Sequence, residues 1–82
     1  MRLTIYSKPG CHLCDEMKAV VHRVIDSRAD MPLDEIDISS DPALLDRYGL
    51  EIPVLLIDGT KVAKYRVSEE ELRRMIESRG KG

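Results

Sequence analysis

The chain has 82 residues, which is room for one small domain, and we expect a single domain over residues 1–82. Hydrophobic residues make up 43% of the sequence and charged residues 34%, a balance that is typical of globular proteins and excludes a disordered or low-complexity chain. The net charge of -2 argues against nucleic-acid binding, because nucleic-acid-binding proteins are normally basic.

The first segment predicts a strand over residues 2–6, where Leu3 and Ile5 alternate with Thr4 and Tyr6. This short alternation differs from the longer apolar core of a secretion signal. We therefore expect the protein to remain in the cytoplasm. The next residues, Ser7-Lys8-Pro9-Gly10, have the composition of a turn.

Apolar residues then recur at helical spacing, which predicts an amphipathic helix of about four turns that begins near Cys11. The apolar positions of this helix are Leu13, Met17, Val20, Val21, Val24 and Ile25. The segment from Asp26 to Pro32 is expected to interrupt the helix.

The next apolar residues, Leu33, Ile36 and Ile38, predict a second short strand. Asp41-Pro42 is typical of a helix start, with Asp41 as the N-cap and proline at the first helical position. Gly49 follows this short helix, where we expect it to form a left-handed C-cap.

A nearly continuous apolar run, Pro53–Ile57, predicts a strand that is covered on both faces. The run is far too short to span a membrane, which needs about 20 residues, and we expect no membrane association. Asp58-Gly59 is a tight-turn dipeptide and predicts a hairpin to a last strand over residues 61–67. We expect Tyr6 and Tyr65 to pack within their strands, and the charges of the last strand, on Lys61, Lys64 and Arg66, to protect a sheet edge.

Ser68 and Glu71 form a capping-box pair that predicts a final helix ending at Gly80. Glutamate–arginine pairs at i, i+4, namely Glu69–Arg73 and Glu70–Arg74, support this helix. Its buried stripe is Leu72, Met75 and Ile76. The predicted order is β-α-β-α-β-β-α, with the first two strands parallel and the last two antiparallel.

Cys11 and Cys14 are the two cysteines of the chain, and they have Cys-x-x-Cys spacing. A reducing cytoplasm argues against a structural disulfide. A closed zinc site needs four ligands, and only His12 and His22 could complete one. Redox chemistry is therefore the leading interpretation. The alternatives are a metal or iron–sulfur site shared with a second chain, and inert thiols.

The segment Ser7-Lys8-Pro9-Gly10-Cys11-His12-Leu13-Cys14 follows a strand and opens a helix, and Ile52-Pro53 opens a later strand. In these features, and in length and element order, the chain resembles glutaredoxin-like proteins. The resemblance implies a thioredoxin-like α/β fold with a four-stranded mixed sheet flanked by three helices. It also implies that Cys11 attacks, that Cys14 resolves, and that the Ile52-Pro53 bond is cis and packs against the cysteines.

Thiol–disulfide exchange needs a thiolate, which an ordinary cysteine with a pKa near 8.5 rarely supplies at neutral pH. The helix start is expected to lower the pKa of Cys11, because the amides of Leu13 and Cys14 can point at its sulfur. Lys8 adds a positive charge in the loop that precedes this helix start. Burial and the acidic residues that follow Cys14 are expected to keep it protonated. We expect His12 to be neutral and to tune the pair, and metal ligands are not expected.

The residues expected to bind substrate or to tune the cysteines are Lys8, Pro9, Gly10, His12, Leu13, Ile52 and Pro53. Glutathione-using glutaredoxins carry Gly-Gly followed by Asp before the last helix, and residues 62–68 lack these residues. Glu51 also places a negative charge where anionic glutathione would approach. These departures leave classical glutathione binding open.

We therefore predict a monomeric dithiol oxidoreductase that acts transiently on protein or glutathione mixed disulfides, without a bound cofactor. Glutathione and a thioredoxin-reductase-like flavoenzyme are both candidate electron donors. The alternatives are a dedicated electron donor to one reductase, such as ribonucleotide reductase, and a non-catalytic metal or iron–sulfur module.

Overall fold

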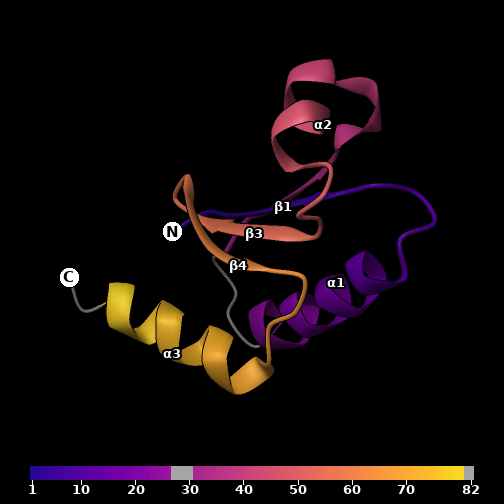
Figure 1. Cartoon of the computed structure of the whole chain (residues 1–82). Helices are drawn as coiled ribbons and strands as arrows, with labels where there is room; N and C mark the ends of the chain where they lie inside the picture. Colours follow the sequence, from indigo (N-terminus) through magenta and orange to yellow (C-terminus); the bar gives the residue numbers. More distant parts are fainter. Residues whose placement is uncertain (27–30, 81–82) are drawn as a thin grey trace.

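The computed structural model describes residues 1–26 and 31–80. The predicted interruption over Asp26–Pro32 therefore lies partly outside the described residues. Within those residues the predicted order of strands and helices is confirmed (Figure 1), and no helix is long and apolar enough to cross a membrane. The elements are β1 (Leu3–Ser7), α1 (His12–Ile25), β2 (Leu33–Asp37), the 3-10 turn η1 (Ile38–Ser40), α2 (Pro42–Tyr48), β3 (Val54–Ile57), β4 (Thr60–Lys64) and α3 (Glu69–Gly80).

The four strands form one mixed sheet in the order β2-β1-β3-β4. Strands β1 and β2 are parallel, as predicted from the helix between them, whereas β3 is antiparallel to both β1 and β4. At the β3–β4 turn, Asp58 and Gly59 both have positive φ, 49° and 83°. The pairing of Tyr6 with Val54 places the end of β1 beside the start of β3. The cysteine-bearing loop and Pro53 therefore lie at the same end of the sheet, where β1 ends and β3 begins.

Each face of the sheet has its own apolar core. Helices α1 and α3 lie on one side of the sheet and α2 lies on the other (Figure 1). The core on the α1 and α3 side comprises Leu3, Ile5, Met17, Val21, Val24, Leu55, Ile57, Val67, Leu72 and Ile76, and the core on the α2 side comprises Ile38, Tyr48, Val54 and Leu56. Because side chains alternate along a strand, β3 contributes to both cores, which is why all four of its residues are apolar and buried.

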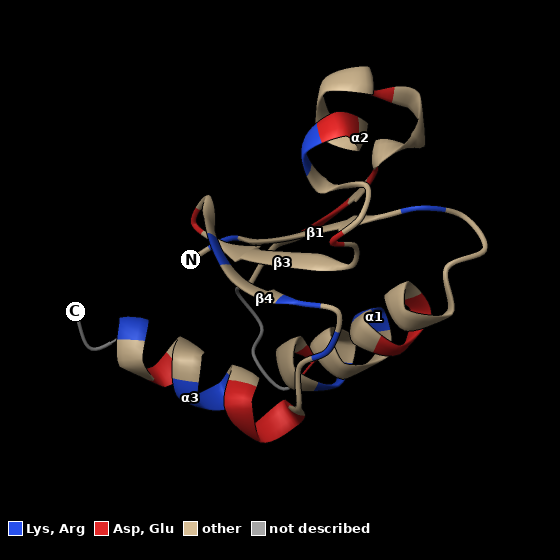
Figure 2. Cartoon of the chain, in the orientation of Figure 1, with Lys and Arg blue, Asp and Glu red and all other residues tan. Residues whose placement is uncertain are grey.

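The predicted helix starts are confirmed in detail. The Asp41 carboxylate accepts hydrogen bonds from the amides of Ala43 and Leu44 at 3.0 and 3.2 Å. Ser68 and Glu71 form the reciprocal capping box, with bonds of 3.1 and 3.3 Å. Both predicted glutamate–arginine pairs of α3 are present. Figure 2 shows acidic residues in the first turn of α3 and basic residues further along it, as the helix dipole favours.

Two predicted strand ends are wrong. Ile38 lies beyond β2 in η1, because the Asp37 carboxylate accepts hydrogen bonds from the backbone and hydroxyl of Ser39 at 2.9 and 2.6 Å. These bonds turn the chain away from the sheet. Strand β4 ends at Lys64, before the predicted end at residue 67, because the chain reverses at Tyr65, which has a φ of 69°.

The predicted left-handed cap at Gly49 is also wrong. Its φ of -55° and ψ of -29° are those of a right-handed helix, and its amide donates to the Leu45 carbonyl at 2.8 Å. A Cβ at this position would lie 2.4 Å from the Leu45 carbonyl oxygen. Glycine is required here by close packing against the helix end, not by a left-handed backbone.

Candidate active site

The turn after β1 leads into the start of α1, where both cysteines lie. Gly10 has a φ of 77°, a left-handed conformation that glycine adopts without steric cost, and it is exposed together with Pro9. Cys11 follows with extended backbone and is the N-cap residue of α1. The backbone amide of Cys14 donates to the Cys11 sulfur at 3.2 Å. One of the two predicted amide contacts to this sulfur is therefore present.

The two cysteines differ in exposure. Cys14 is fully buried, whereas Cys11 is half-buried. Their Cα atoms are 5.2 Å apart, within the ordinary range for a disulfide, and their sulfur atoms lie at disulfide distance. The pair can therefore interconvert between dithiol and disulfide within one helical turn, and of the two residues only Cys11 is partly exposed to a partner.

Pro53 directly precedes β3, whose first residue, Val54, pairs with Tyr6 near the end of β1. The Ile52-Pro53 peptide bond is cis, as the resemblance implied. Pro53 is buried and Ile52 is half-buried. The Pro53 carbonyl accepts a hydrogen bond from the Tyr65 amide at 2.8 Å, which ties the proline to the residue after β4.

The remaining predicted site residues lie next to the cysteines in the sequence and differ in how exposed they are. Lys8 and Leu13 are half-buried, and Lys8 makes no ion pair with the described residues. The His12 side chain is 88% exposed, and its Nε2 lies 3.6 Å from the Glu16 carboxylate. The structure thus places these residues at the start of α1, and their roles in catalysis stay predictions.

Tyr65 is a site residue that sequence reasoning missed. It lies outside β4, and its positive φ with the bond from the Arg66 amide to the Lys64 carbonyl at 2.8 Å defines a tight γ-turn. An aromatic residue rarely adopts this backbone. The Tyr65 hydroxyl donates to the Leu50 carbonyl at 3.2 Å. The expectation that Tyr65 packs within a strand is therefore wrong, whereas Tyr6 does pack, with its ring 4.9 Å from that of Tyr48.

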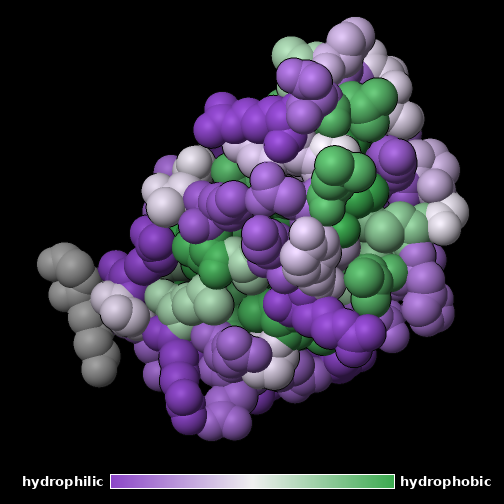
Figure 3. All heavy atoms as spheres, in the orientation of Figure 1, coloured by the Kyte–Doolittle hydropathy of each residue, from purple (hydrophilic) through white to green (hydrophobic). Residues whose placement is uncertain are grey.

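The loop before Pro53 also carries an exposed apolar side chain, because Leu50 is 94% exposed and Tyr65 beside it is 41% exposed. In Figure 3, hydrophobic side chains reach this face of the molecule between the α2 region and α1, in patches separated by hydrophilic side chains. No sequence pattern distinguishes Leu50 from a buried leucine.

The negative charge predicted at Glu51 is present but paired. Lys61 donates to its carboxylate at 2.9 Å, and the Lys64 ammonium lies 3.9 Å away. The hydrogen bond from Lys61 is the main reason that the pKa of Glu51 lies below its usual value. The lysines of β4 thus bind the loop before Pro53 as well as marking the sheet edge.

Among residues 1–26 and 31–80, no group of three or more His, Cys, Asp or Glu side chains is arranged to hold a metal ion.

Comparison with known proteins agrees with this fold. Residues 2–77 match the family described as Glutaredoxin-like domain (DUF836). The chain is similar to a Dictyostelium discoideum protein named glutaredoxin-like protein YDR286C homolog, with 27% identity over 88% of this chain and 71% of that protein. It also resembles the structure of protein XcR50 from X. campestris, with 27% identity, a TM-score of 0.71, and coverage of 93% and 96% of the two chains.

A thioredoxin mutant from Halobacterium salinarum is a further structural neighbour, with 28% identity, a TM-score of 0.61, and coverage of 94% of this chain and 72% of that one. The neighbours confirm the thioredoxin fold. Together with the Cys11–Cys14 pair at disulfide distance, they suggest a thiol redox function. With a family match that spans residues 2–77, the chain belongs to the glutaredoxin-like domain family.

Proposed function

We propose that the protein is a dithiol–disulfide oxidoreductase that reduces disulfides in other proteins, or their mixed disulfides with glutathione. The asymmetry of the cysteine pair is the observation that carries this proposal. The half-buried Cys11 sulfur accepts the Cys14 amide hydrogen bond at 3.2 Å, and the Cys14 sulfur lies fully buried behind it.

The first step is attack by the Cys11 thiolate on a substrate disulfide. The amide donor and the partial positive charge at the start of α1 favour the thiolate form of Cys11. A bond forms between the Cys11 sulfur and one substrate sulfur, while the substrate disulfide breaks. The second substrate sulfur leaves as a thiolate and takes a proton from solvent.

The second step releases the substrate. Burial favours the neutral thiol of Cys14 until the mixed disulfide forms. Cys14 then loses its proton and attacks the Cys11 sulfur, and the substrate sulfur that was bonded to Cys11 leaves as a thiolate and takes up a proton. The substrate has gained two electrons, and the protein has lost two in forming the Cys11–Cys14 disulfide, which the 5.2 Å Cα separation accommodates.

The oxidised pair is then reduced again by two molecules of glutathione or by a thioredoxin-reductase-like flavoenzyme, and the chain needs no bound cofactor. In place of the Gly-Gly-Asp of glutathione-using relatives, the chain has the γ-turn at Tyr65 followed by Arg66. This region offers a cation and not an acid, so the amino group of glutathione lacks its usual partner there. We further propose that the protein works in the cytoplasm as a monomer.

Trapping the intermediate tests the assignment of roles. The Cys14→Ser variant, mixed with a peptide disulfide, should accumulate one covalent peptide adduct on Cys11, visible by mass spectrometry after acid quenching. The Cys11→Ser variant is the matched control and should form none. A Cys14→Ser protein that stays unmodified would contradict the proposal.

Equilibration of the native protein in graded glutathione redox buffers tests the dithiol chemistry itself. We expect loss of two hydrogens with a midpoint of roughly -200 to -270 mV. Thiols that stay reduced throughout, together with stoichiometric metal or visible colour in the purified protein, would instead support the metal-binding module.

A further inference from the structure

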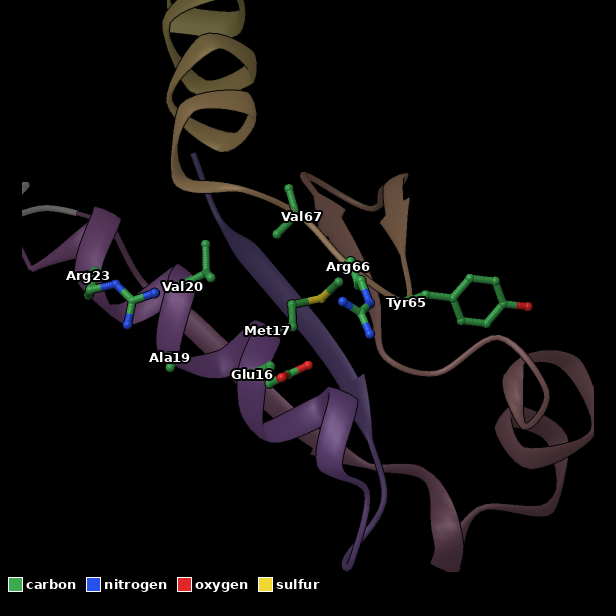
Figure 4. Close-up of a pocket in the computed structure, with 8 residues that line it drawn as sticks. All are labelled: Glu16, Met17, Ala19, Val20, Arg23, Tyr65, Arg66 and Val67. Atoms are coloured by element: carbon green, nitrogen blue, oxygen red, sulfur yellow. The ribbon is translucent and has the colours of Figure 1, made fainter.

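A groove of about 400 Å³ lies between α1 and the segment that follows β4 (Figure 4). Its apolar lining includes Met17 and Val20 from α1 and Val67 from the opposite side. The charged side chains of Glu16, Arg23 and Arg66 border this apolar surface. The groove is open to solvent, so a side chain of another molecule can enter it.

Both sides of the groove continue directly from the cysteine site. On the α1 side, Met17 is three residues beyond Cys14, and side chains at this spacing lie on the same face of a helix. On the other side, Tyr65 is bonded through its amide to the carbonyl of Pro53. A chain whose disulfide meets Cys11 would therefore extend over the groove.

The γ-turn at Tyr65 sends two neighbouring side chains in different directions. The Tyr65 ring points away from α1, and its hydroxyl reaches Leu50 (Figure 4). Arg66 points toward α1, over the groove (Figure 4). Because Tyr65 is held by both its amide and its hydroxyl, the position of Arg66 is fixed by the fold.

The charged side chains that border the groove differ in their ion pairing. Arg23 is paired with Glu69, which also pairs with Arg73 at 3.5 Å. Glu16 lies 3.6 Å from His12. The guanidinium of Arg66 is exposed and has no ion-pair partner within the part of the chain that the structure describes.

We propose that this groove binds the segment of a protein substrate next to its disulfide, and that Arg66 selects substrates with an acidic side chain there. The proposal rests on the dithiol function proposed above and names its substrate class. An apolar substrate residue packs on the half-buried Val20 in the groove, and a neighbouring carboxylate bonds to the guanidinium. Glu16 repels acidic groups on the α1 side, so the carboxylate lies on the side of Arg66.

The test uses short peptides that contain one disulfide and an apolar residue, with Glu, Gln or Lys placed in turn on each side of the reacting cysteine. The rate constant kcat/KM for each peptide is divided by that for neutral 2-hydroxyethyl disulfide. At low salt we expect the best Glu peptide to exceed its Gln counterpart about fivefold, with the ratio falling as salt is added.

Charge variants identify the residue responsible. Arg66→Gln should abolish the preference and Arg66→Glu should reverse it toward the Lys peptide, whereas Glu16→Gln should increase it. Arg79→Glu, at the far end of α3, makes the same change in net charge and should leave the preference unchanged.

Equal rates for the three peptides with the native protein, or a preference that survives Arg66→Gln, would overturn the proposal. Activity on 2-hydroxyethyl disulfide distinguishes failure of the groove proposal from failure of the dithiol function. If this small disulfide is reduced but the peptides are not discriminated, only the groove proposal fails. If no disulfide is reduced, the dithiol function fails and the groove proposal fails with it.

Discussion

Two segments of the candidate site, which we call the cysteine wall and the proline wall, are held in place by different kinds of contact. The cysteine wall, residues 8–14, is held by contacts close in sequence, such as the amide of Cys14 to the sulfur of Cys11, three residues away. The proline wall, residues 50–53 with residues 64–66, is held by contacts between distant segments. The Tyr65 hydroxyl reaches Leu50, 15 residues away, and Lys61 reaches Glu51, 10 residues away.

This difference separates the chemistry of the site from the presentation of substrate to it. One helix start contains the attacking sulfur, its amide donor and the buried second sulfur. The surface on which a substrate can lie depends instead on how β3, β4 and the loop before Pro53 pack. Changes in the cysteine wall should therefore alter reactivity, and changes in the proline wall should alter stability and substrate choice.

The largest expected effect comes from the cysteine wall. Cys11→Ser removes the accessible sulfur, and we expect disulfide reduction to fall to the rate of the uncatalysed exchange. Since serine is a good N-cap residue, α1 should keep its start and the protein should remain folded. Disulfide reduction assays and far-ultraviolet circular dichroism check this. Residual turnover through Cys14 would show that the deeper sulfur is accessible after all.

The next largest expected effect is a loss of stability when the start of α3 is weakened. Helix α1 is capped by the reactive cysteine, whereas α3, just beyond the proline wall, is capped by Ser68. We expect Ser68→Ala to lower the free energy of unfolding by about 1 kcal/mol, as measured by urea denaturation, with little change in reactivity of Cys11. Ser78→Ala, exposed on the same helix, is the control and should change stability by less than about 0.5 kcal/mol.

The hydroxyl of Tyr65 is a smaller but more specific connection within the proline wall. Tyr65→Phe removes its bond to Leu50, and we expect a loss of about 0.5 kcal/mol in unfolding free energy. We also expect kcat/KM to fall more for protein disulfides than for 2-hydroxyethyl disulfide. Tyr6→Phe, in the strand next to β3, should leave both quantities nearly unchanged. If the two variants have the same unfolding free energy and the same kcat/KM, the hydrogen bond from Tyr65 to Leu50 contributes to neither stability nor substrate choice.

The smallest effect depends on pH. Because the folded protein lowers the pKa of Glu51, its ionised form stabilises the fold above the ordinary glutamate pKa of about 4.3. This contribution is lost as the pH falls through the folded pKa. Glu51→Gln should therefore have a slightly lower Tm than the native protein at pH 7, and the difference should shrink as the pH falls below the ordinary glutamate pKa. A Tm difference that does not change with pH would show that the hydrogen bond to Lys61 does not depend on the charge.

Several features of the molecule could be predicted because their causes are local. The alternation of Leu3 and Ile5 with polar residues, the Asp41-Pro42 start of α2 and the Ser68–Glu71 box each involve residues a few positions apart. The errors occurred at element ends, where competing contacts decide. At Gly49, a close approach to Leu45 mattered more than the usual role of glycine after a helix.

The part of the site that was missed lies in the proline wall. Nothing in the letters around Tyr65 indicates a positive φ, because tyrosine ordinarily avoids that backbone and only surrounding contacts can enforce it. Likewise, Leu50 has the apolar character of a core residue, but the loop before Pro53 leaves it in solvent. The groove below Arg66 forms only where α1 and the segment after β4 come together.

By itself, the sequence determined the order of the elements, the position of the cysteines at a helix start and the apolar stripes of the first and last helices, because periodicity and capping act within a few residues. Tertiary structure alone decided that the Tyr65 turn faces the loop before Pro53, that β4 lysines neutralise Glu51, and that Arg66, without an ion-pair partner among residues 1–26 and 31–80, lies over a groove. These outcomes depend on distances between segments remote in sequence, which no local pattern specifies.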